Sequence, residues 1–312
     1  MGWMAGVLAL RARAANGDGE ALNALGDNAR WGGRRDIGEA ARLYVKGAGK
    51  GNADAGRSLG WMRWRGEGGT LQDWREACRA WREAAEKGHP EASYLLGDAL
   101  LQGFPVGEHS KAQAGHDDAL VEARRWMEVG AEGGYPPAMH NLGVMLLRGE
   151  GGEAGSEGEA EQWLEKGFEG GVAASGAVLG DLAHDAGDAA GALEWWVKAA
   201  ALGDAGAAMM LGYAYRTGAG VGESEVEAAT WFARAAKAGH PEAQFALAEC
   251  YESGSGIRGG AVDEHEAYLL YAKAAGAGHA EAAVRVAQLR TKFKFDRARQ
   301  KADEREGARG RR

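Results

Sequence analysis

The first residues that could carry chemistry are the eight histidines. A protein zinc site brings histidines and cysteines together at short spacings such as His-x-x-x-His, and no such spacing occurs in this chain. His89, His240 and His279 each follow a glycine directly and stand at the same place in a recurring pattern. We therefore predict that they serve at a turn or a helix start, and we expect no metal and no cofactor.

The thiols and the glycine-rich stretches are the other chemical candidates. Cys78 and Cys250 form neither a disulfide framework nor a metal-binding pair, so a reducing compartment is the default expectation. Residues 66–69 and 149–152 are glycine-rich, but they lack a preceding strand and the Gly-Lys-Ser/Thr ending of a phosphate-binding loop. Loops between helices are the better interpretation, and we expect no catalytic residue and no enzymatic activity.

The formal net charge of −8 is unevenly distributed along the chain. Residues 290–312 hold ten basic and four acidic side chains, so this tail carries +6 and the remainder −14. Phosphate binding is driven by clustered basic charge, so the acidic body argues against nucleic acid as the main ligand. The tail is open to interpretation as a helix extension, a targeting signal or an anionic-partner site, and we favour a solvated end.

The apolar run at residues 4–10 bears on localisation. It is too short to span a bilayer, and no basic residue precedes it. We therefore expect no signal peptide, no membrane span and a cytoplasmic location, while the basic tail leaves a nuclear location open.

Glycine spacing reveals the elements that position all these residues. The chain has 52 glycines in 312 residues, more than double the usual share of about 7%. One pattern recurs eight times: a glycine, a small residue four positions later, and an apolar–small pair four and five positions after that. The repeat length averages about 37 residues, typical of helical repeats. The leading glycines are Gly17, Gly51, Gly88, Gly134, Gly171, Gly203, Gly239 and Gly278.

Each repeat also contains a second element. A bulky pair lies seven to eight positions before the next leading glycine, and an alanine usually lies three positions before it. This spacing is typical of a helix with one packed face. Another glycine, seven residues after the leucine of the pattern, is expected to end the first helix. It is present as Gly66, Gly103, Gly149, Gly218 and Gly254.

Glycines inside the first helix require a compensation, because each costs about 1 kcal/mol relative to alanine. At Gly97 and Gly143 we expect two helix backbones to approach closely. Bulky side chains such as Trp163 and Trp231 are expected to fill the space between neighbouring helix pairs.

The predicted fold is all-α, a right-handed α-solenoid of antiparallel helix pairs, because a single pair cannot bury its apolar face alone. Residues 1–16 are expected to form a partial helix or N-terminal cap. Residues 17–289 are expected to hold about seven helix pairs plus a terminal half unit. The basic tail at 290–312 completes the chain.

These motifs resemble the Sel-one-like repeat family, a relative of the tetratricopeptide repeats. The match is clearest at 203–243, and the resemblance covers roughly residues 5–288. Two units depart from the pattern, since one has a long loop through 103–122 and the unit at 171–202 is short. The clearest segment contains Ala207, Leu211-Gly212, the loop Gly218-Ala219-Gly220-Val221 and the run Trp231-Phe232-Ala233-Arg234-Ala235-Ala236.

The resemblance implies a protein–protein interaction scaffold or adaptor that presents a concave surface to a peptide or protein partner. First-helix residues facing that surface are the candidate contacts, because aromatic and arginine side chains are common interface anchors. For Tyr215 and Tyr251 a core role is favoured, and for Trp61 and Trp64 the two roles weigh equally. The full candidate set is Trp61, Arg63, Trp64, Arg65, His140, Tyr213, Tyr215 and Tyr251.

Two alternatives stay open at this point. Cysteine-rich relatives are linked to β-lactam binding or hydrolysis, but they carry a cysteine pair in each repeat, which Cys78 and Cys250 cannot reproduce; a loop site near 103–122 is the other enzymatic option. A nucleic-acid-binding tail would give an affinity that falls steeply with salt and disappears when 290–312 is removed.

Overall fold

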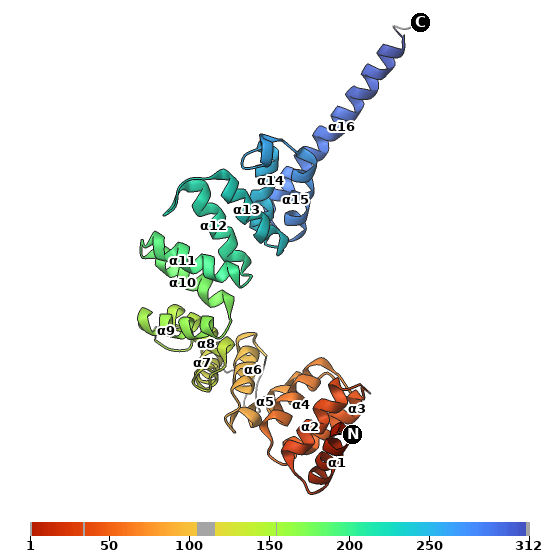
Figure 1. Cartoon of the computed structure of the whole chain (residues 1–312), viewed down its shortest axis with the longest axis vertical. Coiled ribbons are helices and arrows are strands. Elements are labelled where there is room, and N and C mark those ends of the chain that lie inside the picture. Colours follow the sequence, from red (N-terminus) through yellow and green to blue (C-terminus); the bar gives the residue numbers. More distant parts are fainter. Residues whose placement is uncertain (1, 34, 105–115, 154, 310–312) are drawn as a thin grey trace. The chain divides into compact units, whose positions relative to one another are not determined.

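The computed structural model describes residues 2–33, 35–104, 116–153 and 155–309. Within these ranges the regular structure is helical, with sixteen α-helices and one short 3-10 turn. The chain forms two compact units, unit 1 (Met1–Val172) and unit 2 (Ala173–Arg312), and Figure 1 colours them from red to blue along the sequence.

Unit 1 consists of a leading helix followed by four helix pairs in the part that the structure describes. The helices of a pair pack against each other, and each repeat contributes one pair. The leading helix is α1 (Gly2–Ala15), and the pairs are α2 (Gly19–Trp31) with α3 (Ile37–Gly49), α4 (Ala53–Arg65) with α5 (Trp74–Ala85), α6 (Pro90–Leu101) with α7 (His116–Glu132), and α8 (Pro136–Arg148) with α9 (Glu157–Glu169).

Unit 2 consists of three helix pairs and a long final helix, again among the described residues. The pairs are α10 (Ala173–Asp185) with α11 (Ala189–Ala201), α12 (Ala205–Thr217) with α13 (Glu225–Lys237), and α14 (Pro241–Ser253) with α15 (Glu264–Gly276). The 3-10 turn η1 (Arg258–Gly260) lies between α14 and α15, and α16 (Ala280–Arg309) packs against α15. The predicted all-α fold of stacked helix pairs, the solenoid class, is confirmed.

Helix starts and ends follow the local sequence signals. His89 and His240 are the N-caps of α6 and α14, and each ring accepts a hydrogen bond from a backbone N–H in the first turn, which confirms the predicted helix-start role. Such a cap satisfies a donor that the helix itself leaves unpaired. At the other end, Gly218 and Gly254 close α12 and α14 with φ of 73° and 77°, in the left-handed region that glycine enters without strain.

In α2, α4, α6, α8, α10 and α12 the glycine in the middle of the first helix faces the second helix of the same pair. A Cβ atom at Gly60 would lie 2.2 Å from Trp81 Nε1, and one at Gly212 would lie 2.4 Å from the Phe232 ring. The predicted close approach of helix backbones holds at Gly97, where a Cβ atom would lie 3.1 Å from a backbone carbonyl oxygen of α7. At Gly60 and Gly212 the reason is different, because a bulky ring occupies the space that a side chain would need.

In α9 and α13 the bulky pair of the second helix divides into two roles. Phe232 and Leu164 are fully buried, whereas their neighbours Trp231 and Trp163 are only half-buried. Trp163 and Trp231 thus pack against the core without being fully buried, and their filling of the space between neighbouring helix pairs stays a prediction. The second member of the pair packs on the glycine, and the first lies at the rim of the core.

Other sequence expectations differ in detail from the structure. The long loop expected at 103–122 ends earlier, because α7 already begins at His116; residues 105–115, which include His109, lie outside the described ranges. The helix α16 continues from residue 280 through the expected tail boundary at 289 and 290. The start of the tail is thus an extension of α16, which is the first helix of the last repeat.

Candidate partner-binding surfaces

Each unit gathers candidate side chains from several of its helices. In unit 1 these side chains are aromatic, and in unit 2 they form hydrogen bonds and ion pairs. We call the first group the aromatic cluster and the second the polar network. The aromatic cluster consists of Trp61, Trp64, Trp74, Trp81 and Phe104. The polar network consists of Tyr213, Arg216, Glu242, Glu249, Glu252, Tyr271, His279 and Arg285.

The aromatic cluster is built around Trp81, which is buried on Gly60 and donates its indole N–H to the Arg57 carbonyl at 3.2 Å. The Trp61 ring meets Trp81 edge-on at a centroid distance of 5.7 Å, and the Trp64 ring lies 5.4 Å from it. These are favourable aromatic geometries. Trp61 and Trp64 are therefore held by the core and are half-buried, with part of each side chain accessible.

The aromatic cluster extends towards α6 through one more ring contact. Trp64 meets Phe104 at 4.7 Å, and Trp74, the first residue of α5, lies 5.8 Å from Phe104. Rings from α4, α5 and the end of α6 thus share one patch of unit 1.

Two arginines border the aromatic cluster. The Arg65 guanidinium lies 5.1 Å from the centre of the Trp61 ring, which is a cation–π geometry. Arg65 is exposed, with a loose ion pair to Glu67 at 3.7 Å. Arg63 is half-buried instead and pairs with Glu76 at 3.2 Å. Of the two, Arg65 is the side chain that a partner could contact without breaking a close ion pair.

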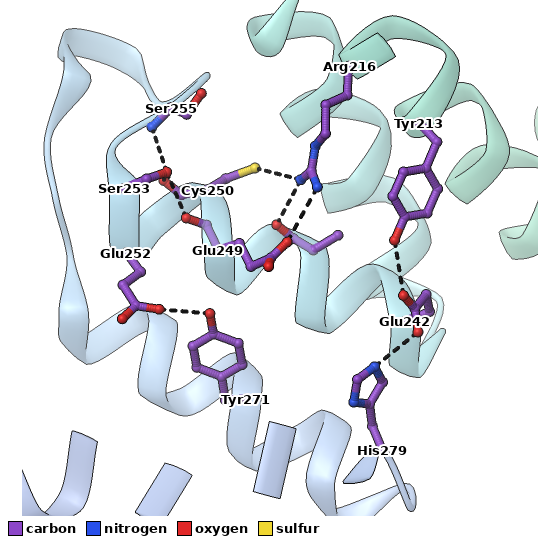
Figure 2. A network of polar contacts seen from close by, with 11 residues as sticks. Tyr213, Arg216, Glu242, Glu249, Cys250, Glu252, Ser253, Ser255, Tyr271 and His279 are labelled. Atoms are coloured by element: carbon purple, nitrogen blue, oxygen red, sulfur yellow. Dashed lines mark hydrogen bonds and ion pairs between the residues drawn. The ribbon is translucent and has the colours of Figure 1, made fainter. Parts of the chain in front are cut away.

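Glu242 holds together one group of the polar contacts in unit 2 (Figure 2). Tyr213 on α12 donates its hydroxyl hydrogen to Glu242 Oε1 at 3.0 Å. His279, just before α16, has its Nε2 2.9 Å from Glu242 Oε2. A single carboxylate on α14 therefore connects three consecutive first helices.

The imidazole of His279 has a defined tautomer in this arrangement. Its Nδ1 accepts a hydrogen bond from the Ala282 backbone N–H at 3.2 Å, so Nε2 carries the proton and donates to Glu242. The same ring stacks on Phe245 with centroids 4.5 Å apart. His279 thus caps a helix, contacts an aromatic ring and binds a carboxylate from the preceding repeat.

An equivalent link occurs in unit 1. His89 caps α6 and has its Nε2 3.1 Å from Asp54 Oδ1 of the preceding repeat. His240 caps α14 in the same way, but the residue that corresponds to Asp54 is Gly206, which offers no carboxylate. The cap is a property of the repeat, and the carboxylate link depends on the individual sequence.

The remaining polar contacts lie along α14. Arg216 Nη1 is 3.3 Å from Glu249 Oε2, and its guanidinium lies 4.5 Å from the Phe232 ring centre. Further along, Glu252 accepts the Tyr271 hydroxyl at 2.8 Å and pairs with Arg285 at 2.6 Å. Burial is the main cause of the raised pKa of both tyrosines. The pKa of Tyr213 is raised to about 12, and that of Tyr271 is raised as well. Both phenols are protonated at neutral pH and act as donors.

The other expected contact residues are half-buried. Tyr215 and Tyr251 pack against the apolar core of unit 2, and His140 lies on α8 in unit 1. The structure thus brings Trp61, Trp64 and Arg65 together at one patch and places Tyr213 in a separate network. Whether any of them contacts a partner stays a prediction.

The two thiols are the nucleophilic candidates among the described residues. Cys78 and Cys250 are free and buried, and burial raises the pKa of both thiols, to about 11 for Cys78. A protonated thiol is a poor nucleophile and a poor metal ligand. No three histidine, cysteine or acidic side chains of the described chain are grouped to hold a metal ion.

One serine motif also has a structural explanation. Residues 56–60 match the letters of the Gly-x-Ser-x-Gly nucleophile elbow, a match that the sequence-based expectation of no catalytic residue left out. Ser58 lies inside α4 and is buried, whereas an elbow serine is exposed at a sharp turn between strand and helix. The motif therefore reflects the two glycines of a helical repeat.

Sequence reasoning missed most of the polar network. Arg216, Glu242 and Glu249 were not singled out, because each partner lies in the next repeat and no local motif marks it. One signal was available for Glu242: His279 follows it by about one repeat length, as His89 follows Asp54.

Comparison with known proteins gives the relationship of the repeats. A family model described as the Sel1 repeat matches residues 19–52, 53–89, 90–135, 136–172, 184–204, 205–240 and 241–279. The fifth match is the shortest and falls in the unit that lacks the glycine-rich loop. The resemblance inferred from the sequence is thereby confirmed. No curated protein matches the chain.

Solved structures that are similar to the chain include the following two. One is a protective antigen present in uropathogenic Escherichia coli strains and displaying an SLR fold; it is 27% identical, with a TM-score of 0.78 over 91% of this chain. This chain covers only 59% of that structure. The other, a Sel1 repeat protein from Oxalobacter formigenes, is 22% identical, has a TM-score of 0.69 and is matched over 81% of this chain and 96% of its own. The second likeness concerns the fold alone.

Within the described part of the chain, no helix combines the length and the apolar character needed to cross a membrane.

Proposed function

The chain belongs to the Sel1 repeat family, and we propose that it is a non-enzymatic scaffold or adaptor whose first helices bind a peptide or protein partner. Sel1 repeats generally act as protein-interaction scaffolds. The finer proposal is that the aromatic cluster of unit 1 and the bordering Arg65 provide the contacts.

The observation that carries the proposal is the half-buried, partly accessible pair Trp61 and Trp64, packed on buried Trp81 and flanked by exposed Arg65. Tryptophan and arginine are the residue types most enriched among binding hot spots. Side chains already fixed by the core lose little conformational entropy on binding. A rigid aromatic surface with an exposed cation at its edge suits a peptide that offers an apolar side chain and a carboxylate.

The buried groups of the described chain support a binding role over a catalytic one. Its two thiols have raised pKa values, and the serine of the glycine-rich motif at 56–60 is buried inside α4. These groups are therefore poorly suited to covalent chemistry on a bound partner.

A matched pair of charge reversals tests the proposal. Arg65 and Arg79 have nearly equal side-chain exposure, 57% and 58%, and each has one acidic neighbour, but Arg65 borders the aromatic cluster and Arg79 lies on α5. The full chain, Arg65→Glu and Arg79→Glu would be used as bait in extracts of the native cells, with quantitative mass spectrometry.

The proposal predicts partner proteins that wild type and Arg79→Glu retain equally and that Arg65→Glu loses at least tenfold. Trp61→Ala should lose the same proteins, because it removes an anchor ring from the same patch. Equal recovery by all four baits would show that the aromatic cluster is not the binding surface.

A further inference from the structure

Every first helix before the last is covered by a second helix in a fixed register. The residue nine positions after the leading glycine is small, and a bulky residue of the second helix packs on it. Gly180 with Trp196 and Gly212 with Phe232 are the examples from unit 2. In α14 the small residue is Ala248, which is fully buried, as is Tyr271 of the covering helix α15.

The helix α16 is the first helix of the last repeat, and it keeps the first half of this pattern. His279 caps it, and Ala282 and Leu289 are buried. The difference comes where the first helix should end. Gly254 ends α14 fifteen positions after its leading glycine, but Phe293 occupies the corresponding place in α16.

The helix therefore does not turn back. It continues to Arg309, so residues 293–309 cannot supply a second helix that covers α16.

The uncovered face of α16 is an apolar strip. Val284, Ala287, Thr291 and Phe295 lie at spacings of three and four residues, which place them on one side of a helix. Val284 is 55% exposed and Phe295 70% exposed. In α14 the residue that corresponds to Val284 is Phe245, which is only 7% exposed.

Basic side chains border the strip on one side. Arg290, Lys294 and Arg297 are exposed, and none of them makes an ion pair with another side chain that the structure describes. Two other cations of α16 are already satisfied, since Arg285 pairs with Glu252 and Lys292 pairs with Glu264. The unpaired cations leave a local excess of positive charge beside the strip.

A hollow between α15 and α16 adjoins these cations. Its volume is about 560 Å³, and the rings of Tyr268 and Phe293 meet edge-on within its lining, 5.8 Å apart. The lining residues are His265, Tyr268, Arg290, Phe293, Lys294, Asp296 and Arg297. The hollow thus combines aromatic surface with four basic side chains and one acidic one.

We propose that the strip on α16 binds an acidic amphipathic helix of a protein partner, which takes the place that a second helix has in the preceding repeats. A bulky apolar residue of that helix packs on Ala287, as Phe232 packs on Gly212. Its carboxylates face Arg290, Lys294 and Arg297. This surface is separate from the aromatic cluster and goes beyond the function proposed above.

The observations favour a helix over a nucleic acid. The strip is apolar, and an amphipathic helix covers such a strip with residues at spacings of three and four. Nucleic acid would leave Val284 and Phe295 without an apolar contact, although it would neutralise the same cations. Charge complementarity specifies an acidic helix, because the border of the strip is basic.

The chain itself contains a suitable probe, the second helix α9. It packs Leu164 on Gly143, and its sequence holds five glutamates against one lysine. The probe would be a fluorescein-labelled, end-capped peptide of residues 156–170. The control peptide would replace the five glutamates with glutamine. Binding to the full chain would be followed by fluorescence anisotropy at 150 mM salt, about the physiological ionic strength.

Three protein variants decide where the peptide binds. The triple variant Arg290→Glu, Lys294→Glu, Arg297→Glu reverses the basic border. Ala287→Trp fills the position on which the bulky residue should pack. Lys237→Glu, an exposed charge reversal in the last turn of α13, is the matched control. All the substituted residues are exposed, so circular dichroism should show unchanged folding.

The proposal predicts that the acidic peptide binds the wild-type chain saturably and binds Lys237→Glu equally well. The glutamine peptide should bind the wild-type chain at least tenfold more weakly. The acidic peptide should bind the triple variant and Ala287→Trp at least tenfold more weakly. Absence of binding up to about 1 mM peptide would overturn it. So would equal binding to the triple variant, or displacement of the peptide by a single-stranded oligonucleotide of about 20 nucleotides. Self-association that Ala287→Trp abolishes would identify a second copy as the occupant instead. None of these outcomes depends on Arg65, so the scaffold proposal stands or fails separately.

Discussion

The neighbouring first helices α14 and α16 have nearly the same repeat pattern but different surroundings. In α14, Ala243, Leu247 and Ala248 are all buried, and α15 packs along the helix. In α16 the corresponding Ala282 is buried, but Ala287 is exposed. The two helices share their packing towards the preceding repeat and differ in packing towards a following helix.

The difference teaches that the repeat motif specifies one side of a first helix by itself. The other side depends on whether the chain turns back. A glycine in the left-handed region allows the turn after α14, with a φ of 77° at Gly254. A phenylalanine at the same place cannot adopt that conformation without strain, and α16 continues. The helix α16 has no glycine at this place, and its residues Val284 and Phe295 stay exposed.

The largest effect should come from removing the ring that covers α14. Tyr271 is fully buried, so Tyr271→Ala leaves a cavity and should reduce the free energy of unfolding by about 3–5 kcal/mol. Tyr268→Ala, on the same helix but half-buried near α16, should cost less than half as much. Urea unfolding followed by circular dichroism gives both values. Equal losses would show that α14 and α16 are covered alike.

A methyl group at a covered glycine should have the next largest effect. In Gly212→Ala the new Cβ atom would lie 2.4 Å from the Phe232 ring, and overpacking of this kind costs about 1–3 kcal/mol. Gly276→Ala is the control, because a Cβ atom there meets nothing within 4 Å and alanine favours the helix. Thermal unfolding should show a lower midpoint for Gly212→Ala and an equal or higher one for Gly276→Ala. A stabilised Gly212→Ala would refute the packing of ring on glycine.

Breaking the carboxylate link between first helices should have a smaller effect. Glu242→Ala removes the partners of Tyr213 and His279 together, and we expect a loss of about 1 kcal/mol because the carboxylate is partly exposed. Glu266→Ala, an exposed acidic residue in the first turn of α15, should change stability by less than about 0.5 kcal/mol. Hydrogen exchange should rise at the start of α16 only in Glu242→Ala. Unchanged exchange there would mean that Glu242 does not hold the start of α16.

The smallest effect is a dependence on alkaline pH. Burial raises the pKa of Tyr213 to about 12, from about 10 in an unfolded chain. Between these values the unfolded state loses the proton and the folded state keeps it, so this contribution to stability falls as pH rises from about 10 to 12. Tyr213→Phe lacks the contribution, and its stability should fall less steeply over that window. Parallel curves for the two proteins would contradict the raised pKa.

Much of the fold could be predicted because the core residues of a repeat protein recur at fixed spacing along the sequence. The leading glycines, the leucine of the first helix and the bulky pair of the second helix recur at fixed spacing, and the buried residues follow them. The pattern left one ambiguity, namely which member of the bulky pair is buried. Phe232 and Trp231 are adjacent and both suit a core, and only the helix rotation decides between them.

The binding surfaces were less predictable for a physical reason. Trp61 and Trp64 could be named because residue type alone marks an anchor. The link between Glu242 and His279 depends on how far side chains reach from one repeat to the next, which the sequence does not encode locally. The apolar strip on α16 could not be foreseen, since its exposure depends on the helix continuing past Phe293.

The measurement that tests the central comparison most directly places the same substitution in both helices. Ala248→Leu adds a large side chain at a fully buried position and should cost about 1–3 kcal/mol or more. Ala287→Leu makes the same change at the corresponding exposed position of α16 and should alter stability by less than about 0.5 kcal/mol. Urea unfolding of the two full-length variants should therefore give one clearly destabilised protein and one like wild type. If Ala287→Leu is destabilised as much as Ala248→Leu, the face of α16 is covered and the account is wrong.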